Sequence, residues 1–223
     1  LLSERDLMRR NDAITSASLE TRLHLLETWR RKGDARVSRE DGDPVVCRRI
    51  DQAARQWLRL LENGPGSRDF AAIGSLLVAA YPDRIARQRT GQRDRYLLAS
   101  GRGAFLTPTD PLAASEYLVV PHLDAGQREG RIFLAESVDI EELRQQHSHL
   151  LTTMEQVDWD DSQAKVVAVR RVCLGEIVVT ETPLADVDPE AARQTLLTGI
   201  RRMGLACLPW NREARQMQAR VQC

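Results

Sequence analysis

The spacing of apolar residues predicts a helical first third of the chain. Leucines recur along residues 19–26 at the spacing of one helix face, and Ser18 stands before them as a cap residue. Two further apolar faces at helical spacing cover residues 46–61 and 70–81. Because proline cannot continue a helix, Pro82 ends the last of these or begins a short turn. The pattern therefore predicts three helices before the strands begin.

Two polar stretches rich in glycine and proline separate these helices. Residues 33–44 contain two glycines and a proline, and we interpret them as a loop. Residues 63–67 read Asn-Gly-Pro-Gly-Ser, which predicts a clear break in the chain. We therefore assign residues 1–65 to a first, helical segment.

Beyond Arg93 the period of the apolar positions falls from 3.6 to 2, which is typical of strands. Gly101 and Gly103 predict a tight turn between the first two strands, and residues 140–150 predict a short helix. Short strands joined by small turns favour a barrel or a sandwich, which we place, after a basic helix end, in residues 66–187. The expected strands are residues 95–100, 104–107, 117–123, 131–136, 153–159, 165–174 and 176–182.

The last part of the chain again predicts helices, and we assign residues 188–223 to them. Asp188 and Pro189 stand in the order of a cap and a first helical residue. Asn211 is a second candidate cap residue. Because that last helical pattern still continues at Cys223, and the chain starts with leucine, we expect the sequence to be a fragment.

Composition narrows the class of protein. The chain has 223 residues, of which 42% are apolar, as in ordinary globular proteins. Its apolar stretches are far shorter than the roughly 20 residues that span a bilayer, so we expect no membrane contact. Its first ten residues carry charges of both signs, unlike a signal peptide. The four cysteines lack metal-ligand spacing, and we expect reduced thiols in a cytoplasmic protein.

The net charge of zero conceals strongly charged segments. Residues 111–165 carry 11 acidic and 4 basic residues, whereas residues 84–102 carry six arginines and one aspartate. Guanidinium groups neutralise phosphates and aromatic rings stack on bases, so this stretch predicts a surface that binds single-stranded nucleic acid. The candidate binding residues are Arg84, Arg87, Arg89, Arg93, Arg95, Tyr96, Arg102 and Phe105.

Two details bear on this candidate surface. Arg84 and Arg87 are three residues apart and are expected to share a helix face. Gly101 and Gly103 would let the backbone approach a phosphate closely. The alternative interpretation is a solvated arginine-rich surface that pairs with the acidic residues 111–165.

The sequence contains no pattern that predicts catalysis by this chain. A phosphate-binding loop, a dinucleotide fingerprint, a GxSxG elbow and an HExxH motif are all missing from it. Residues 158–162 begin like a calcium loop, but Gln163 and Val169 replace the glycine and the glutamate that such a loop needs. We interpret them as a charged hairpin turn. No catalytic residue, metal site or cofactor site is assigned.

An ordered set of motifs resembles the HrpB family of bacterial DEAH-box ATP-dependent helicases. The match covers nearly the whole chain and begins with the helicase-associated helices that follow the motor domains of the family. It continues through the segment after the helical bundle to the start of the family's C-terminal extension. The matching segments are 2–6, 19–23, 80–86, 95–98, 101–104, 157–160, 174–176 and 208–210.

This resemblance implies an α+β fold: a helical bundle segment, then a small OB-like β-barrel, then C-terminal helices. It implies a region that packs on the RecA-like motor domains and helps to form the channel for single-stranded RNA or DNA. Because the motor motifs are missing, the chain is expected to have no ATPase activity. ATP and Mg²⁺ are expected only for the full-length parent protein.

Two other functions stay open at this point. The chain could be a structural or protein-interaction module, in which the helices and the acidic residues 111–165 dock on the motor or on another partner without nucleic acid. An apolar stripe of the first helices would then be a domain interface. A hydrolase that uses paired carboxylates is the third interpretation, although no nucleophile or metal cluster supports it.

Overall fold

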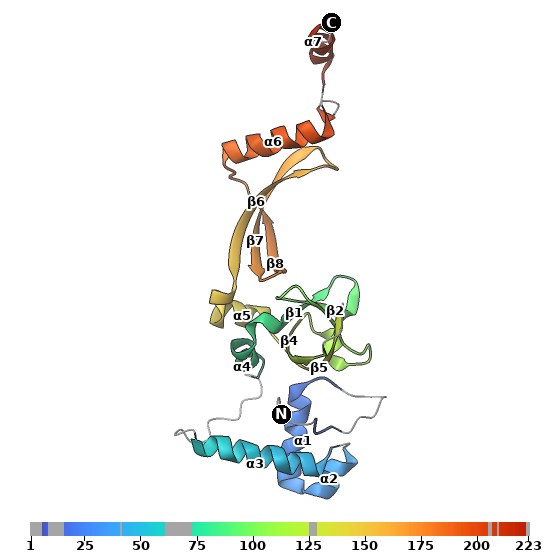
Figure 1. The fold of residues 1–223 in the computed structure, drawn as a ribbon, viewed down its shortest axis with the longest axis vertical. Helices are drawn as coiled ribbons and strands as arrows, with labels where there is room; N and C mark the ends of the chain where they lie inside the picture. Colours follow the sequence, from blue (N-terminus) through green and yellow to red (C-terminus); the bar gives the residue numbers. More distant parts are fainter. Residues whose placement is uncertain are drawn as a thin grey trace. The chain divides into compact units, whose positions relative to one another are not determined.

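The computed structural model describes residues 6–8, 16–40, 42–60, 73–124, 129–204, 207–208 and 210–221. It has an α+β fold of helices and a closed five-stranded barrel, as the sequence predicts (Figure 1). The chain divides into two compact units: residues 1–151 with 174–177, and residues 152–173 with 178–223. The predicted break at 63–67, together with Phe70 and Cys223, lies outside the described residues.

Three helices open the first unit: α1 (Leu19–Lys32), α2 (Asp34–Arg39) and α3 (Pro44–Leu60). Ser18 caps α1 as predicted, because its hydroxyl oxygen accepts a hydrogen bond of 3.2 Å from the Thr21 backbone N–H. The loop expected at residues 33–44 is wrong, since α2 lies within it. The buried Val37 explains the difference, because it joins the leucines of α1 in one core and holds this short segment as a helix.

The barrel occupies the middle of the first unit. Its strands follow the order β1-β2-β3-β5-β4, and β1 also pairs with β4, which closes the barrel. All neighbouring strands are antiparallel except β3 and β5, which are parallel. The five strands are β1 (Ile85–Arg89), β2 (Gln92–Leu98), β3 (Gly103–Phe105), β4 (Tyr117–Leu123) and β5 (Glu129–Ser137).

Alternate residues of each strand fill the barrel interior, as the period of 2 requires. The interior includes Ala86, Tyr96, Leu98, Ala104, Leu106, Leu118, Val120 and Ile132, all almost completely buried. Their strand neighbours point outward, so the charged side chains of β1 and β2 gather on the outside of the barrel.

Short helices cover the barrel, and residues 17–20 around the start of α1 bond directly to its strand β5. The Ala17 carbonyl accepts a hydrogen bond of 2.9 Å from the Ala135 N–H, and the buried Glu136 carboxylate accepts one of 2.8 Å from the Glu20 N–H at the start of α1. These covering helices are α4 (Ile73–Ala80) and α5 (Ile140–Gln146), with 3₁₀ helices η2 (Pro82–Arg84), η3 (Pro111–Ala114) and η4 (Ser148–Leu150).

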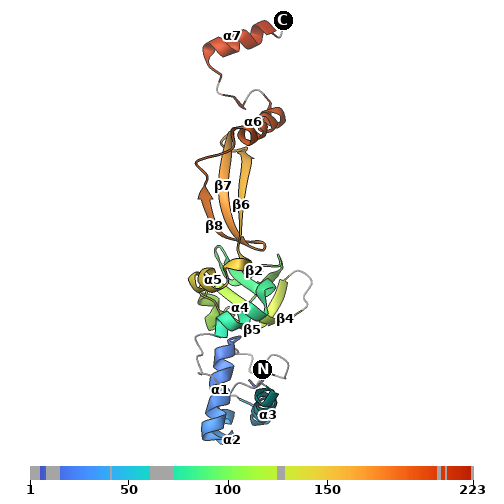
Figure 2. The same ribbon diagram turned by 90° about the vertical axis from the view of Figure 1, so that its left-hand side faces the viewer.

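The last three strands do not enter the barrel, which corrects the expectation of one barrel or sandwich made of about seven strands. They form a separate sheet in the order β6-β7-β8 (Figure 2). The physical reason lies in the sequence of β6, where four of residues 152–156 are polar, so that this stretch has no continuous apolar face to fill a barrel interior. The strands are β6 (Thr152–Asp160), β7 (Lys165–Leu174) and β8 (Ile177–Pro183).

The hairpin turn between β6 and β7 has the charged form predicted for residues 158–162. The Asp160 carboxylate accepts hydrogen bonds from the Ser162 N–H at 2.8 Å and from the Ser162 hydroxyl at 2.6 Å. These bonds lower the pKa of Asp160, because they stabilise its charged form. The carboxylate is thus used to close the turn.

Two helices complete the second unit and begin at the predicted caps. They are α6 (Pro189–Met203) and α7 (Arg212–Val221). The Asp188 carboxylate accepts a hydrogen bond from the Glu190 N–H at 3.3 Å, and the Asn211 side chain accepts one from the Ala214 N–H at 2.7 Å. Helix α6 packs on the end of β6, where the Trp159 indole N–H donates to the Met203 sulfur at 3.1 Å.

Candidate nucleic-acid interface

Arg84 and Arg87 do not share a helix face, contrary to the sequence prediction. Arg84 is the last residue of η2, whereas Arg87 lies on β1. Ile85 and Ala86 are both fully buried, Ala86 in the barrel interior, and this burial on both sides draws the chain into an extended strand directly after Arg84. The Arg84 guanidinium donates a hydrogen bond of 2.7 Å to the Pro121 carbonyl, so it ties η2 to β4.

Three of the predicted arginines lie on the outside of the barrel and pair with carboxylates. Arg87 forms an ion pair of 3.0 Å with Glu116. Arg89 lies 3.3 Å from one carboxylate oxygen of Glu129, and Arg95 pairs with the other. Both carboxylates belong to the acidic residues 111–165, so the pairing that the alternative interpretation expected is present.

The strand register places aromatic rings beside these arginines. Arg95, Phe105 and Arg131 stand opposite one another across β2, β3 and β5. The Arg95 guanidinium carbon lies 5.2 Å from the centre of the Phe105 ring, and that of Arg131 lies 5.6 Å from the centre of the Phe133 ring. We call this surface the outer face; it comprises Arg89, Arg95, Phe105, Glu129, Arg131 and Phe133.

Arg131 and Phe133 were missed by the sequence reasoning, although both lie within a predicted strand. The alternation along β5 places them on the same side, opposite to the buried Ile132. The signal that could have found them was this alternation. The position of Arg131 opposite Phe105, however, depends on the parallel pairing of β3 with β5, which no local pattern encodes.

Tyr96 is a core residue and does not lie on the outer face. Its side chain is fully buried, and its hydroxyl lies 3.1 Å from the Leu112 carbonyl oxygen and 3.0 Å from that of Ser115. Burial raises the pKa of this phenol. Because successive residues of a strand point to opposite sides, Tyr96 must face inward when Arg95 faces outward.

The other two predicted arginines have different surroundings. Arg93 is exposed on β2, and among the described residues no ion pair to its guanidinium is present. Arg102 is half-buried in the turn between β2 and β3, where it donates a hydrogen bond of 2.7 Å to the Asp124 carbonyl. Arg102 therefore holds the turn in place at the end of β4.

The two glycines of this turn also differ from each other. Gly101 adopts a left-handed conformation with φ of 83°, as a tight turn requires. Gly103 is buried, and side chains from β5 and β1 cover it: a Cβ atom there would lie 2.9 Å from Glu129 Cγ and 3.0 Å from Arg89 Nη2. The expected close approach of a phosphate to the Gly103 backbone is therefore wrong for this conformation, because a carboxylate side chain fills that space.

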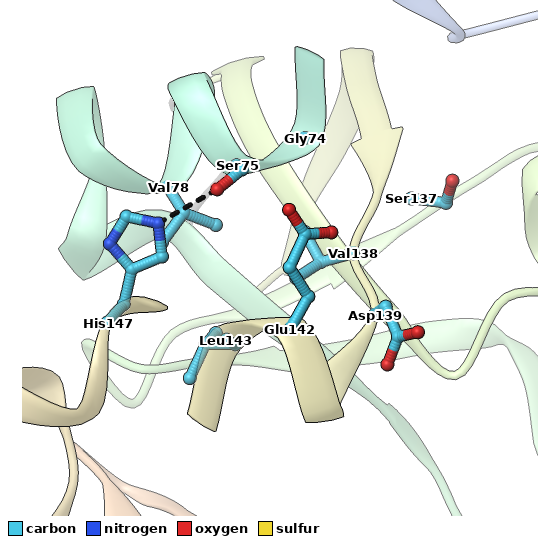
Figure 3. A pocket seen from close by; sticks show the side chains of 9 residues that line it. All are labelled: Gly74, Ser75, Val78, Ser137, Val138, Asp139, Glu142, Leu143 and His147. Atoms are coloured by element: carbon cyan, nitrogen blue, oxygen red, sulfur yellow. Dashed lines mark hydrogen bonds between the residues drawn. The ribbon is translucent and has the colours of Figure 1, made fainter. Parts of the chain in front are cut away.

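A small cavity of about 160 Å³ lies between α4 and α5 (Figure 3). The Ser75 hydroxyl lies 3.0 Å from His147 Nε2 and donates a hydrogen bond of 2.9 Å to the Gln146 side chain. Asp139, on the cavity rim, caps α5 by accepting from the Glu141 N–H at 2.8 Å. These bonds join the two helices. Because the Ser75 hydroxyl contacts both Gln146 and His147, we interpret it as a link between α4 and the end of α5.

Two other features are absent from the part of the chain that the structure describes. No group of three or more His, Cys, Asp or Glu side chains there could hold a metal ion. None of its helices is both long and apolar enough to cross a membrane.

Comparison with known proteins connects this fold with one family. A family model described as the connector region of the ATP-dependent RNA helicase HrpB matches residues 150–184, which contain the β6-β7-β8 sheet. The ATP-dependent RNA helicase HrpB of Escherichia coli (strain K12) is 41% identical over 174 residues, which cover 77% of this chain. The chain fits a fragment of HrpB. It spans about a fifth of that relative, 21% of its length.

Two solved structures extend the match to the first unit. A crystal structure of the E. coli DExH-box NTPase HrpB superposes with a TM-score of 0.63 and 35% identity, covering 95% of this chain and 24% of the HrpB chain. A crystal structure of the Escherichia coli DEAH/RHA helicase HrpB gives a TM-score of 0.55 and 30% identity, covering 89% and 25%. Over nearly its whole length, the chain is therefore similar to a region of HrpB that includes the connector.

Proposed function

We propose that this HrpB region contacts single-stranded nucleic acid, RNA in the first place, through the outer face of its barrel. The observation that carries the proposal is the row of Arg95, Phe105 and Arg131 across three strands. Guanidinium groups bind phosphate oxygens, and each exposed ring edge or face offers a base a stacking partner. The relatives are described as ATP-dependent RNA helicases, which supports RNA as the partner.

The barrel architecture supports the same function. A closed barrel of five strands has the strand number of the OB class, whose second and third strands carry the oligonucleotide-binding face. Here β2 and β3 supply Arg95 and Phe105 to the outer face. Arg84 and Arg102 act as positioning residues, because each donates a hydrogen bond to a backbone carbonyl of the barrel.

The end of α3 supports packing on the motor domains of the parent protein. Trp57 and Leu60 are 68% and 70% exposed, although the apolar face of the same helix is buried at Val46 and Ile50. The apolar face of α3 is thus buried along the first half of the helix and exposed along the second half. An exposed apolar face of this kind is typical of a surface that another protein domain covers. ATP and Mg²⁺ would then be bound by those motor domains, in a cytoplasmic helicase.

The alternative function is a structural or protein-interaction module without nucleic-acid contact. One observation favours it: Arg87, Arg89 and Arg95 each already pair with a carboxylate of the same chain. In that case the outer face is a surface of internal ion pairs, and the chain contributes only its docking on the motor.

A binding titration of the 223-residue chain separates the two functions. Fluorescence anisotropy of a labelled single-stranded oligouridylate should show weak, salt-sensitive binding. If about four phosphates are neutralised, a plot of log K against the logarithm of the salt concentration should have a slope near −3. The double substitution R95A/R131A should weaken binding and make the slope shallower by about 1.4, since each phosphate contact contributes about 0.7. R144A, an arginine substitution on α5, is the matched control. If neither the salt concentration nor the R95A/R131A substitution changes the affinity for the oligouridylate, the structural module is favoured.

A further inference from the structure

The Glu129 carboxylate occupies the position on the outer face where two arginines meet. Its oxygens pair with Arg89 of β1 and Arg95 of β2, and its Cγ covers Gly103 of β3. Side chains from β1, β2 and β5 thus meet at one point above Gly103 of β3. Glycine leaves the space for this arrangement, because a Cβ at residue 103 would lie 2.9 Å from Glu129 Cγ and would force the Glu129 side chain to shift.

This cluster is more enclosed than an ordinary surface ion pair. The Glu129 side chain is 23% exposed, and the Arg89 and Arg95 side chains are 41% and 40% exposed. Partial burial reduces the screening by water, so such pairs hold more firmly than fully exposed ones. Arg95 has a second carboxylate nearby, Asp94, but at 3.7 Å it is the more distant partner.

We propose that Glu129 is a built-in competitor for the phosphates of the nucleic acid that the outer face binds. This inference rests on the proposed function and names how that same site is regulated. A carboxylate and a phosphate present similar pairs of oxygens to a guanidinium fork, so both cannot hold Arg89 and Arg95 at once. A strand that binds the face must displace Glu129 from both arginines.

One consequence is a lower affinity of the outer face for every phosphate ligand. The single Glu129 carboxylate holds both arginines, and one phosphate has enough oxygens to do the same. The competitor therefore acts against inorganic phosphate, mononucleotides and strands alike, and a strand binds more tightly only through its further contacts with the outer face.

The test compares E129Q with the native chain in anisotropy titrations with single-stranded oligouridylate. Glutamine keeps the size of the side chain but loses its charge, so E129Q should bind about fivefold more tightly, as expected for release of a partly exposed ion pair. E129D, which keeps the charge on a side chain one methylene shorter, should lie between the two. E141Q on α5 changes the net charge equally and should bind like the native chain. Thermal denaturation verifies that each variant is folded.

A background without the two arginines completes the test. In R89A/R95A, the additional E129Q substitution should no longer raise the affinity, because the competitor has lost its targets. If E129Q binds no more tightly than the native chain while R89A/R95A weakens binding, the competitor is refuted and the proposed function stands. If the native chain and E129Q both fail to bind, the proposed function itself is refuted.

Discussion

Arg95 on β2 and Phe105 on β3 stand directly opposite each other, and the Arg95 guanidinium carbon lies 5.2 Å from the centre of the Phe105 ring. A cation at this distance is attracted by the ring face. The half-buried ring and the guanidinium therefore support each other's position on the outer face. A strand that binds here meets a stacking surface and a charge that the β2–β3 register places side by side.

Replacing Phe105 tests the stacking contribution separately from the charge. F105A should weaken binding of single-stranded RNA by about 1–3 kcal/mol, the usual value of one base stacked on an aromatic ring. F105L fills the space without a ring and should lose most of the same amount. Anisotropy titrations measure both. Duplex RNA, whose bases are not free to stack, is the control ligand; equal losses for duplex and single strand would contradict a stacking role.

The buried hydroxyl of Tyr96 contributes to barrel stability. It lies within hydrogen-bond distance of the Leu112 and Ser115 carbonyl oxygens, which η3 and the residue after it place over the barrel end. Y96F removes the donor and leaves these acceptors without it. We expect a loss of about 1 kcal/mol in the free energy of unfolding, measured by urea denaturation. An unchanged unfolding midpoint would show that water replaces the hydroxyl.

The same residue makes stability depend on alkaline pH. Burial raises the pKa of Tyr96 above its ordinary value of 10.0, and burial also raises that of Tyr117. The folded chain therefore holds these protons more tightly than the unfolded chain does. Their stabilising contribution is complete below about pH 10 and is lost as the pH rises through the folded pKa values. Urea midpoints measured across this range should fall, and they should fall less steeply in Y96F.

Local signals in the sequence predicted the parts of the fold that depend on neighbouring residues. Ser18, Asp188 and Asn211 cap the helices that they were expected to cap, because a cap needs only its own side chain and the next backbone N–H groups. The helix α2 was missed because Val37 is held by the core of α1 and α3, which is a tertiary effect.

The candidate site was less predictable, because it depends on which strands become neighbours. The arginines were recognisable from their density between residues 84 and 102, and strand alternation would have assigned Tyr96 to the interior. The pairing of β3 with β5, which brings Glu129 and Arg131 to this surface, joins segments more than twenty residues apart. No pattern within either segment specifies that partner.

Gly199 permits the contact between α6 and β6 in the second unit. A Cβ atom at this position would overlap the Trp159 ring, so the helix can approach the strand only with a glycine there. G199A should therefore separate the helix from β6 and destabilise the packing by about 1–3 kcal/mol. The Trp159 fluorescence should shift to longer wavelength. T198A, at the neighbouring exposed residue, is the control; a native spectrum in G199A would contradict this packing.

The exposed end of α3 gives a test of docking that is independent of nucleic acid. Trp57 and Leu60 are 68% and 70% exposed, and large apolar side chains such as tryptophan dominate the energy of protein interfaces. W57E/L60E should lower the affinity for a separately produced motor-domain fragment by at least about tenfold, measured by calorimetry. The free energy of unfolding of W57E/L60E should change by only about 0.5 kcal/mol, because exposed positions contribute little to folding.

The substitution L76E on α4, where Leu76 is 68% exposed, controls for the loss of an apolar side chain elsewhere. If W57E/L60E and L76E bind the motor-domain fragment with equal affinity, the docking surface lies away from α3, because Trp57 would then have no partner on the motor.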